Sequence, residues 1–141
     1  MSSILYFNED VTYTLRSKRK INSWLLSVAT EHGTDVECLN YIFCSDEYLL
    51  SINKQYLNHD YYTDIITFDN SSQESLISAD IFVSIDRVQD NAKSNKDTIN
   101  HELHRVMIHG LLHLLGFKDK SIDEQTIMRE KEDACLSLLT L

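Results

Sequence analysis

The segment from His109 to Asp119, which reads HGLLHLLGFKD, constrains the fold of this chain more than any other. His109 and His113 are four residues apart in an apolar run, so on a helix their imidazoles project from the same face. Gly116 follows, and a glycine just past the last helical turn lets the chain reverse direction. Asp119 can then approach both histidines from beyond the helix end. The pattern predicts a helix that stops near Gly116 and a cluster of three potential metal ligands.

Three protein ligands leave the fourth position of a tetrahedral zinc ion open to water, which is typical of catalytic rather than structural zinc sites. The alternative is a chance histidine pair on a surface helix, with Asp119 capping the helix end. The histidines flank a broad apolar arc of the helix, where polar side chains are partly desolvated and need partners. We therefore expect one Zn²⁺ per chain, bound by His109, His113 and Asp119. Glu102, two turns earlier on the same flank, is expected to orient one histidine.

The rest of the chain alternates between short segments typical of strands and longer amphipathic ones. Strands are predicted at residues 4–7, 11–15, 36–44, 65–68 and 81–85. Helices are predicted at residues 18–32, 46–56, 86–94, 98–115 and 121–139. The last helix opens on a capping box of Ser121 and Glu124, and His104 is expected to be exposed on another face of the histidine helix. These elements predict an α+β fold: a single domain over residues 1–141, with a small mixed β-sheet covered by helices and the metal site on a central helix.

The charge of the chain limits its partners. The formal net charge is -9, whereas a general nucleic-acid binder is expected to be basic. Any nucleic-acid site must therefore be a local positive groove beside the metal. The densest positive cluster consists of Arg16, Lys18, Arg19 and Lys20, and it fits a solvated helix start as well as a phosphate contact. Arg87 is a further phosphate candidate, with an exposed helix residue as its alternative.

Nothing in the sequence predicts export or a membrane partner. No apolar stretch approaches the length needed to span a bilayer, and no secretory signal is visible at the N-terminus. The three cysteines, Cys38, Cys44 and Cys135, show no Cys-x-x-Cys spacing. We expect a protein of the reducing cytoplasm without a disulfide-linked partner.

Several blocks of the sequence resemble the YbeY family of bacterial metal-dependent endoribonucleases. The segment 109–119 matches the first nine positions of the family signature H-G-x-L-H-L-x-G-[YF]-D-H. The block from Asn53 to Tyr56, followed by residues 63–68, resembles the family pattern N-x-x-Y-R…P-T-D-V-L-S-F. Met128 and Glu132 resemble its closing M-x-x-x-E segment. The resemblance runs in order through roughly residues 40 to 135.

The chain departs from the family pattern at two positions that matter. The family's third metal ligand is a histidine, and Asp119 stands at that position when no gap is allowed. A gapped alignment would place Lys120 there, but a lysine ammonium has no lone pair to give a metal, whereas a carboxylate binds zinc well. Leu57 stands where the family commonly has an arginine that serves its RNA chemistry.

The resemblance implies a single-strand-specific endoribonuclease that acts in the maturation of ribosomal RNA, notably the 3′ end of the small-subunit RNA, and in ribosome quality control. Ribosomal RNA and the ribosome are then its partners, and a metal-bound water is the attacking group. Glu102 and Asp64 are the candidates for a supporting carboxylate. A peptide substrate is disfavoured because Gly110 replaces the glutamate of the His-Glu-x-x-His proteases. A hydrolase of another substrate, or a ribosome assembly factor with a structural metal, are the alternatives, and the acidic charge and Leu57 favour the latter modestly.

Overall fold

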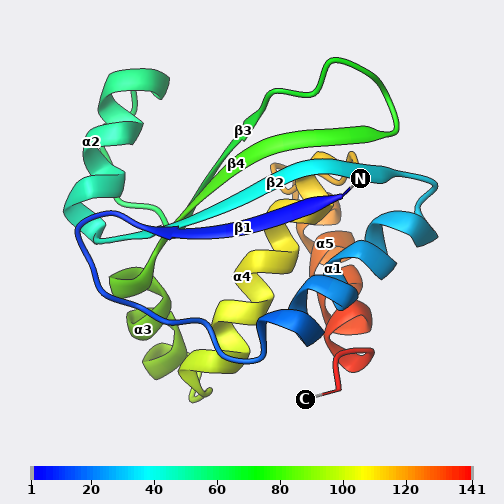
Figure 1. Ribbon diagram of the computed structural model, residues 1–141. Helices are drawn as coiled ribbons and strands as arrows, with labels where there is room; N and C mark the ends of the chain where they lie inside the picture. Colours follow the sequence, from blue (N-terminus) through cyan, green and yellow to red (C-terminus); the bar gives the residue numbers. More distant parts are fainter. Residues whose placement is uncertain (1, 141) are drawn as a thin grey trace.

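The computed structural model describes residues 2–140, within which the chain forms five helices and four strands (Figure 1). The strands are β1 (Ser3–Asn8), β2 (Asp35–Cys44), β3 (Ile65–Asp69) and β4 (Leu76–Ser84). The helices are α1 (Lys18–Glu31), α2 (Asp46–Leu57), α3 (Ile85–Ser94), α4 (Ile99–Leu114) and α5 (Ile122–Ser137). The predicted α+β class, with a small mixed sheet covered by helices, is confirmed.

The sheet has the order β1-β2-β4-β3, in which β3 alone runs antiparallel to its neighbour. Successive side chains of a strand point to opposite faces. On β4, Ile81 therefore joins the main core, whereas the next residue, Phe82, joins a smaller apolar cluster with Leu49 of α2. The antiparallel edge strand β3 brings the segment before Ile65 next to α4.

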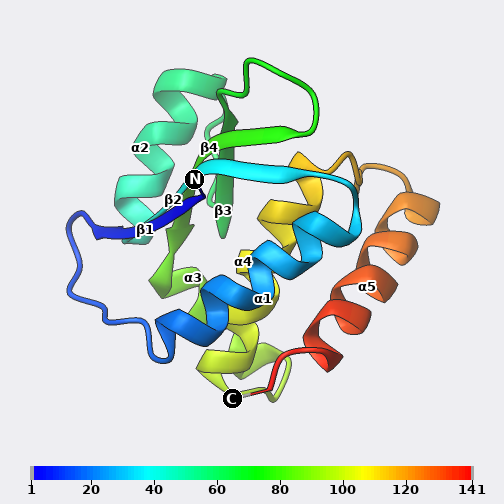
Figure 2. The same ribbon diagram turned by 45° about the vertical axis from the view of Figure 1, so that its right-hand side comes forward.

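Helix α4 is the centre of the helical layer (Figures 1 and 2). The helices α1, α3 and α5 lie around it on one side of the sheet, and α2 packs on the other side. Leu103, Met107 and Leu111 are fully buried along α4, and the Tyr41 hydroxyl of β2 donates to the Met107 carbonyl at 3.0 Å. This packing fixes the rotation of α4 about its axis, and with it the direction in which its two histidines point.

The helix starts follow the polar residues that precede them. The predicted capping box is confirmed: the Ser121 hydroxyl accepts from the Glu124 amide at 3.1 Å, and the Glu124 carboxylate accepts from the Ser121 amide at 2.9 Å. Thr98 caps α4 in the same way, since its hydroxyl accepts from the His101 amide at 3.1 Å. These bonds satisfy amides that have no partner within a helix.

The predicted strand at residues 11–15 is wrong. Its alternation is real, because Val11 and Tyr13 are half-buried and Leu15 is buried, whereas Thr12 and Thr14 are exposed. However, β1 pairs in parallel with β2, so the chain must leave the sheet after β1 and cross to α1 before it can return. The crossing segment buries alternate side chains without forming a strand.

Two further predictions need correction. Strand β4 begins at Leu76 rather than at residue 81. The earlier start was not predicted because Ser78 and Asp80, on the other face of the strand, interrupt the apolar run. His104 is not exposed: it is 5% exposed and packs edge-on against the Trp24 ring of α1, with 6.4 Å between ring centres. Burial lowers the pKa of His104, which favours its neutral form. Both faces of α4 are covered, and periodicity alone does not reveal this.

The remaining predicted elements lie within two residues of their observed bounds. No helix among residues 2–140 is long and apolar enough to cross a membrane. Cys38, Cys44 and Cys135 are all free thiols.

Gly110 packs against side chains of β3 and β4. A Cβ atom built there would lie 2.9 Å from Ile65 Cδ1 and 3.1 Å from Ile81 Cδ1. Real Cβ atoms essentially never come as close as 2.9 Å, so a side chain at this position must displace the ends of these two isoleucine side chains. The glycine between the two histidines is therefore explained by packing, and the distance it sets places the histidines beside β3.

We predict that Gly110→Val lowers the free energy of unfolding by about 1–3 kcal/mol, because the extra carbons overpack the contact with the two isoleucines. Chemical denaturation measures the change. The same side chain introduced by Glu130→Val, at an exposed position of α5, should shift the free energy by no more than about 0.5 kcal/mol. Equal effects of the two substitutions would contradict the close packing at Gly110.

Candidate metal centre

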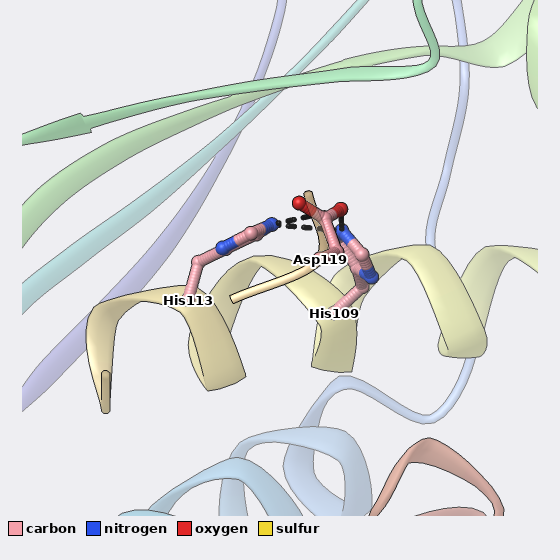
Figure 3. A group of neighbouring side chains, drawn as sticks. All are labelled: His109, His113 and Asp119. Carbon is pink, nitrogen blue, oxygen red and sulfur yellow. Dashed lines mark hydrogen bonds and ion pairs between the residues drawn. The ribbon is translucent and has the colours of Figure 1, made fainter. Parts of the chain in front are cut away.

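His109, His113 and Asp119 converge at the end of α4 (Figure 3). The two Nε2 atoms of the histidines are 3.0 Å apart. Oδ2 of Asp119 lies 3.2 Å from His109 Nε2 and 3.3 Å from His113 Nε2. All three side chains are partly buried, so one donor atom from each residue faces a common point at the rim of the core.

The turn after α4 delivers Asp119 to this point. Gly116 has a φ of 103°, a conformation that residues with a side chain rarely adopt, and it ends the helix. The amide of Phe117 then donates back to the Leu112 carbonyl at 3.0 Å, which closes the turn. The prediction that the helix stops near Gly116 and that the chain returns toward the histidines is confirmed.

The donor set fits a small tetrahedral cation. Zinc bonds of about 2.0–2.1 Å at tetrahedral angles place neighbouring ligand atoms about 3.3–3.4 Å apart. The observed separations of 3.0, 3.2 and 3.3 Å are close to that spacing. Imidazole nitrogens and a carboxylate oxygen present lone pairs to one another here, and such an arrangement needs a proton or a cation between them. The three residues together could hold a metal ion.

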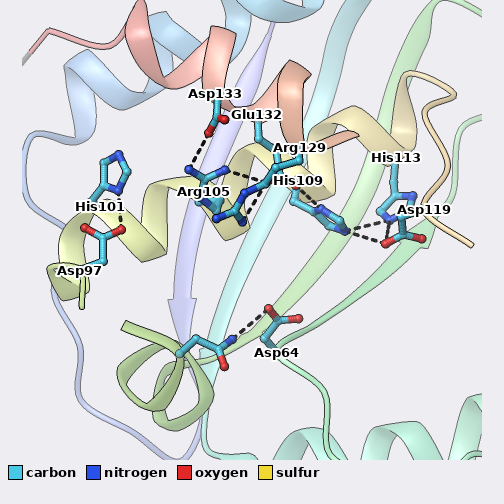
Figure 4. A network of polar contacts seen from close by, with 11 residues as sticks. Asp64, Asp97, His101, Arg105, His109, His113, Asp119, Arg129, Glu132 and Asp133 are labelled. Carbon is cyan, nitrogen blue, oxygen red and sulfur yellow. Dashed lines mark hydrogen bonds and ion pairs between the residues drawn. The ribbon is translucent and has the colours of Figure 1, made fainter. Parts of the chain in front are cut away.

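Glu132 of α5 fixes the orientation of His109 (Figure 4). Its Oε2 lies 2.5 Å from His109 Nδ1, and its Oε1 accepts from Arg105 at 3.0 Å. When Nδ1 carries the proton that Glu132 accepts, Nε2 keeps its lone pair and points it toward Asp119. Burial alone would lower the pKa of His109, but the hydrogen bond and charge of Glu132 and the charge of Asp119 raise it. The surroundings of His109 therefore favour positive charge at this point.

The sequence analysis assigned this orienting role to Glu102, and the structure corrects it. Glu102 is buried, and burial raises its pKa, but the carboxylate against the imidazole of His109 is Glu132. A signal for Glu132 was present in the sequence. Met128, Glu132 and Cys135 recur at helical spacing and are the buried residues of α5, so one inward position of this helix holds an acid that needs a partner.

Two cavities meet at His109 and Asp119. The first, which we call the α5 cavity, has a volume of about 480 Å³ and lies between α4, α5 and the end of α3. The second, which we call the β3 cavity, has a volume of about 680 Å³ and lies between α4, β3 and the segment after α2. His109, Asp119 and Asp64 line both. A bound group at the metal centre would thus be reached from two sides.

Asp64 lies across the cavities from His109 and Asp119, on the segment that leads into β3 (Figure 4). Its Oδ2 accepts a weak hydrogen bond from Asn91 at 3.4 Å. Burial raises the pKa of Asp64, partly offset by the charge of His109. A carboxylate with a raised pKa accepts a proton more readily than an ordinary aspartate does. The structure therefore brings Asp64 together with the predicted ligands.

The predicted cationic residues lie elsewhere. Of the residues described, none of the cluster Arg16, Lys18, Arg19 and Lys20 lines the α5 or the β3 cavity. Arg19 and Lys20 border a separate hollow between α1 and the end of α5, and the Lys18 ammonium lies 5.9 Å from the centre of the Tyr6 ring. These side chains do not form the groove beside the metal that the sequence analysis expected.

Arg87 is also committed to other contacts. Its guanidinium forms an ion pair of 2.8 Å with Asp46 and lies 5.5 Å from the centre of the Tyr62 ring. The cations beside the metal centre are instead Arg105 and Arg129 in the α5 cavity and Lys120 in the β3 cavity. These three belong to α4, to α5 and to the turn before α5, and the sequence analysis assigned none of them to the site.

Comparison with known proteins gives the affiliation of the chain. A model of the family described as endoribonuclease YbeY matches residues 5–140. The chain belongs to the YbeY family. The endoribonuclease YbeY of Cytophaga hutchinsonii is 56% identical over 136 residues, which cover 96% of this chain and 95% of that protein. The endoribonuclease YbeY of Parabacteroides distasonis is 45% identical over 137 residues, covering 97% and 96%.

A solved structure supports the same fold. The solution structure of a Thermotoga maritima protein superposes with a TM-score of 0.65 at 28% sequence identity, covering 95% of this chain and 87% of that one. The YbeY affiliation extends beyond the histidine motif, because the matched residues run from β1 past the end of α5.

We predict that Glu132→Gln weakens metal binding by about 10- to 100-fold, because a neutral amide is a poorer acceptor for the His109 Nδ1 proton. Competition with a coloured chelator measures the affinity. Asp133→Asn is the matched control: Asp133 also accepts from Arg105, at 2.7 Å, but it is exposed and does not touch His109. Equal affinities of the two variants would show that Glu132 has no part in orienting the ligand.

Proposed function

We propose that this protein is a zinc-dependent endoribonuclease that cuts single-stranded RNA and matures ribosomal RNA, notably at the 3′ end of the small-subunit RNA. The whole chain, residues 1–141, would act as one hydrolase domain on the ribosome in the cytoplasm and take part in ribosome quality control. The observation that carries the proposal is the group of His109, His113 and Asp119 at the junction of two cavities. Membership of the YbeY family, whose relatives bear the name endoribonuclease, supports the reaction class.

Zinc is the metal that the donor set favours. Two imidazoles and one carboxylate are typical zinc ligands, and three protein ligands leave one position for water or substrate. A zinc ion bound there would polarise a phosphoryl oxygen and lower the pKa of water toward neutrality. Asp119, rather than Lys120, would complete the ligand set, because its Oδ2 faces both histidines.

The residues around the ligands have separate tasks in this proposal. Glu132 holds the His109 tautomer, and Arg105 neutralises the buried Glu132 carboxylate. Asp64, with its raised pKa, is positioned to accept a proton from the attacking water, and Glu102 in the α5 cavity is the second candidate. Gly110 stands where the His-Glu-x-x-His proteases carry their glutamate, so proton transfer must come from another side chain.

Phosphate contacts would come from the cations of the two cavities. The Arg105 guanidinium is engaged by Glu132 and Asp133, at 3.0 and 2.7 Å. Arg129 is less engaged, since its side chain is 58% exposed and its nearest carboxylate oxygen, on Glu132, is 4.0 Å away. Arg129 is therefore the better phosphate ligand of the two. RNA contacts by Arg87 and by the cluster of Arg16, Lys18, Arg19 and Lys20 remain predictions for RNA extending beyond the metal centre.

We predict that a chelator abolishes cleavage of single-stranded RNA and that added zinc restores it. Asp64→Asn should lower kcat by about 10²- to 10⁴-fold with unchanged zinc content, because the amide cannot accept the proton. Asp69→Asn, at the far end of β3 in the same cavity, should retain normal activity. Cleavage that survives removal of the metal would contradict the zinc mechanism. A metal-loaded protein that binds ribosomal particles but cuts no RNA would favour an assembly factor.

A further inference from the structure

The segment between α2 and β3 presents two aromatic rings at the edge of the β3 cavity. The rings of His59 and Tyr61 are stacked, with 5.1 Å between their centres and 20° between their planes. The Tyr61 hydroxyl and His59 Nδ1 are 3.0 Å apart. Both side chains line the cavity with His109 and His113, yet Tyr61 is 55% exposed and His59 is also exposed. The pair therefore forms an open aromatic surface beside the metal centre.

A buried asparagine holds this segment in place. Asn53 of α2 is 1% exposed, and its side-chain amide donates to the Tyr61 carbonyl at 2.9 Å. The carbonyl of Asn53 accepts from the His59 amide at 3.1 Å, and Asn58 between them has a left-handed φ of 56°. Lys54 and Asp60 add an ion pair of 3.3 Å across the segment. The rings thus sit on an ordered backbone, which lowers the entropy lost when a ligand binds.

The β3 cavity has few positive charges, so an anionic ligand bound there needs contacts other than electrostatic ones. Among the described residues that line this cavity, Lys120 is the one lysine or arginine. Asp64, Asp69 and Asp119 are its acidic residues. Leu57, which also lines this cavity, is uncharged. An acidic chain with few cations at this edge would retain a polyanion weakly by charge alone.

We propose that His59 and Tyr61 form a stacking platform for an unpaired nucleobase of the RNA whose phosphate lies at the metal centre. The inference rests on the proposed function and names the part of the substrate that the β3 cavity takes. Every nucleobase has a π-face, so stacking on an aromatic ring tolerates any sequence. It requires that the base be free of a duplex, and this selects single strands.

Binding of a short 2′-O-methyl oligouridine to the zinc-loaded protein tests the platform, with the probe shown to be intact at the end of each titration. We predict that Tyr61→Ala raises Kd by between about 5-fold and about 150-fold, the range that loss of one base–aromatic stack gives. Tyr61→Phe keeps the ring and should restore most of the affinity. His59→Ala should also weaken binding, and it provides a second variant if Tyr61→Ala is unstable.

Tyr56→Ala is the matched control. Tyr56 is a tyrosine of α2 with 61% exposure, but it packs edge-on against Phe68 and is absent from the cavity lining. Its removal should leave Kd unchanged. The ratio of variant to wild-type Kd should also stay constant between low and high salt, because stacking releases no counterions. A loss that shrinks as salt rises, or that appears equally in Tyr61→Phe, would contradict a stacking role.

The outcomes separate this inference from the proposed function. If the wild-type protein cleaves and binds single-stranded RNA and both alanine variants bind equally well, the platform is wrong and the endoribonuclease stands. If the wild-type protein with bound zinc neither binds nor cleaves RNA, the proposed function fails and the platform fails with it. Equal binding of a double-stranded 2′-O-methyl probe by wild type and Tyr61→Ala, together with the loss on single strands, would support the platform.

Discussion

The hydrogen bond between the buried Glu132 carboxylate and His109 Nδ1 is the interaction on which the site depends. A buried carboxylate is costly unless it is paired, and Glu132 meets that requirement through His109 and Arg105. The same contact joins α5 to α4 and directs the lone pair of His109 toward Asp119. The position of α5 and the chemistry of the metal centre are therefore set together, and removing Glu132 would disturb both.

The local parts of this arrangement were predictable from the sequence, and the long-range parts were not. The spacing of His109, His113 and Gly116 sets a helix face and its end, and the capping box of α5 depends on residues three apart. The pairing of Glu132 with His109 spans 23 residues and depends on how two helices pack, which periodicity does not report. His104 was misassigned for the same reason, because α1 covers its face of α4.

The fold divides the surroundings of the metal centre into two halves of different chemistry. The α5 cavity carries two guanidinium groups among its carboxylates, whereas the β3 cavity carries the aromatic rings of His59 and Tyr61, two leucines, three aspartates and a single lysine among its described lining residues. Asp64 borders both halves because β3, the antiparallel edge strand, begins directly after it. In the proposed function, phosphate would contact the first half and a base the second, which gives an acidic protein a means of binding RNA with few cations.

X-ray absorption of the zinc-loaded protein tests the central claim, that His109, His113 and Asp119 form one metal site with an open position. The account predicts one zinc per chain, surrounded by two imidazole nitrogens and oxygen donors at about 2.0–2.2 Å. Sulfur donors at about 2.3 Å would assign the zinc to the cysteines and contradict the account. A spectrum that His109→Ala and His113→Ala leave unchanged would contradict it as well.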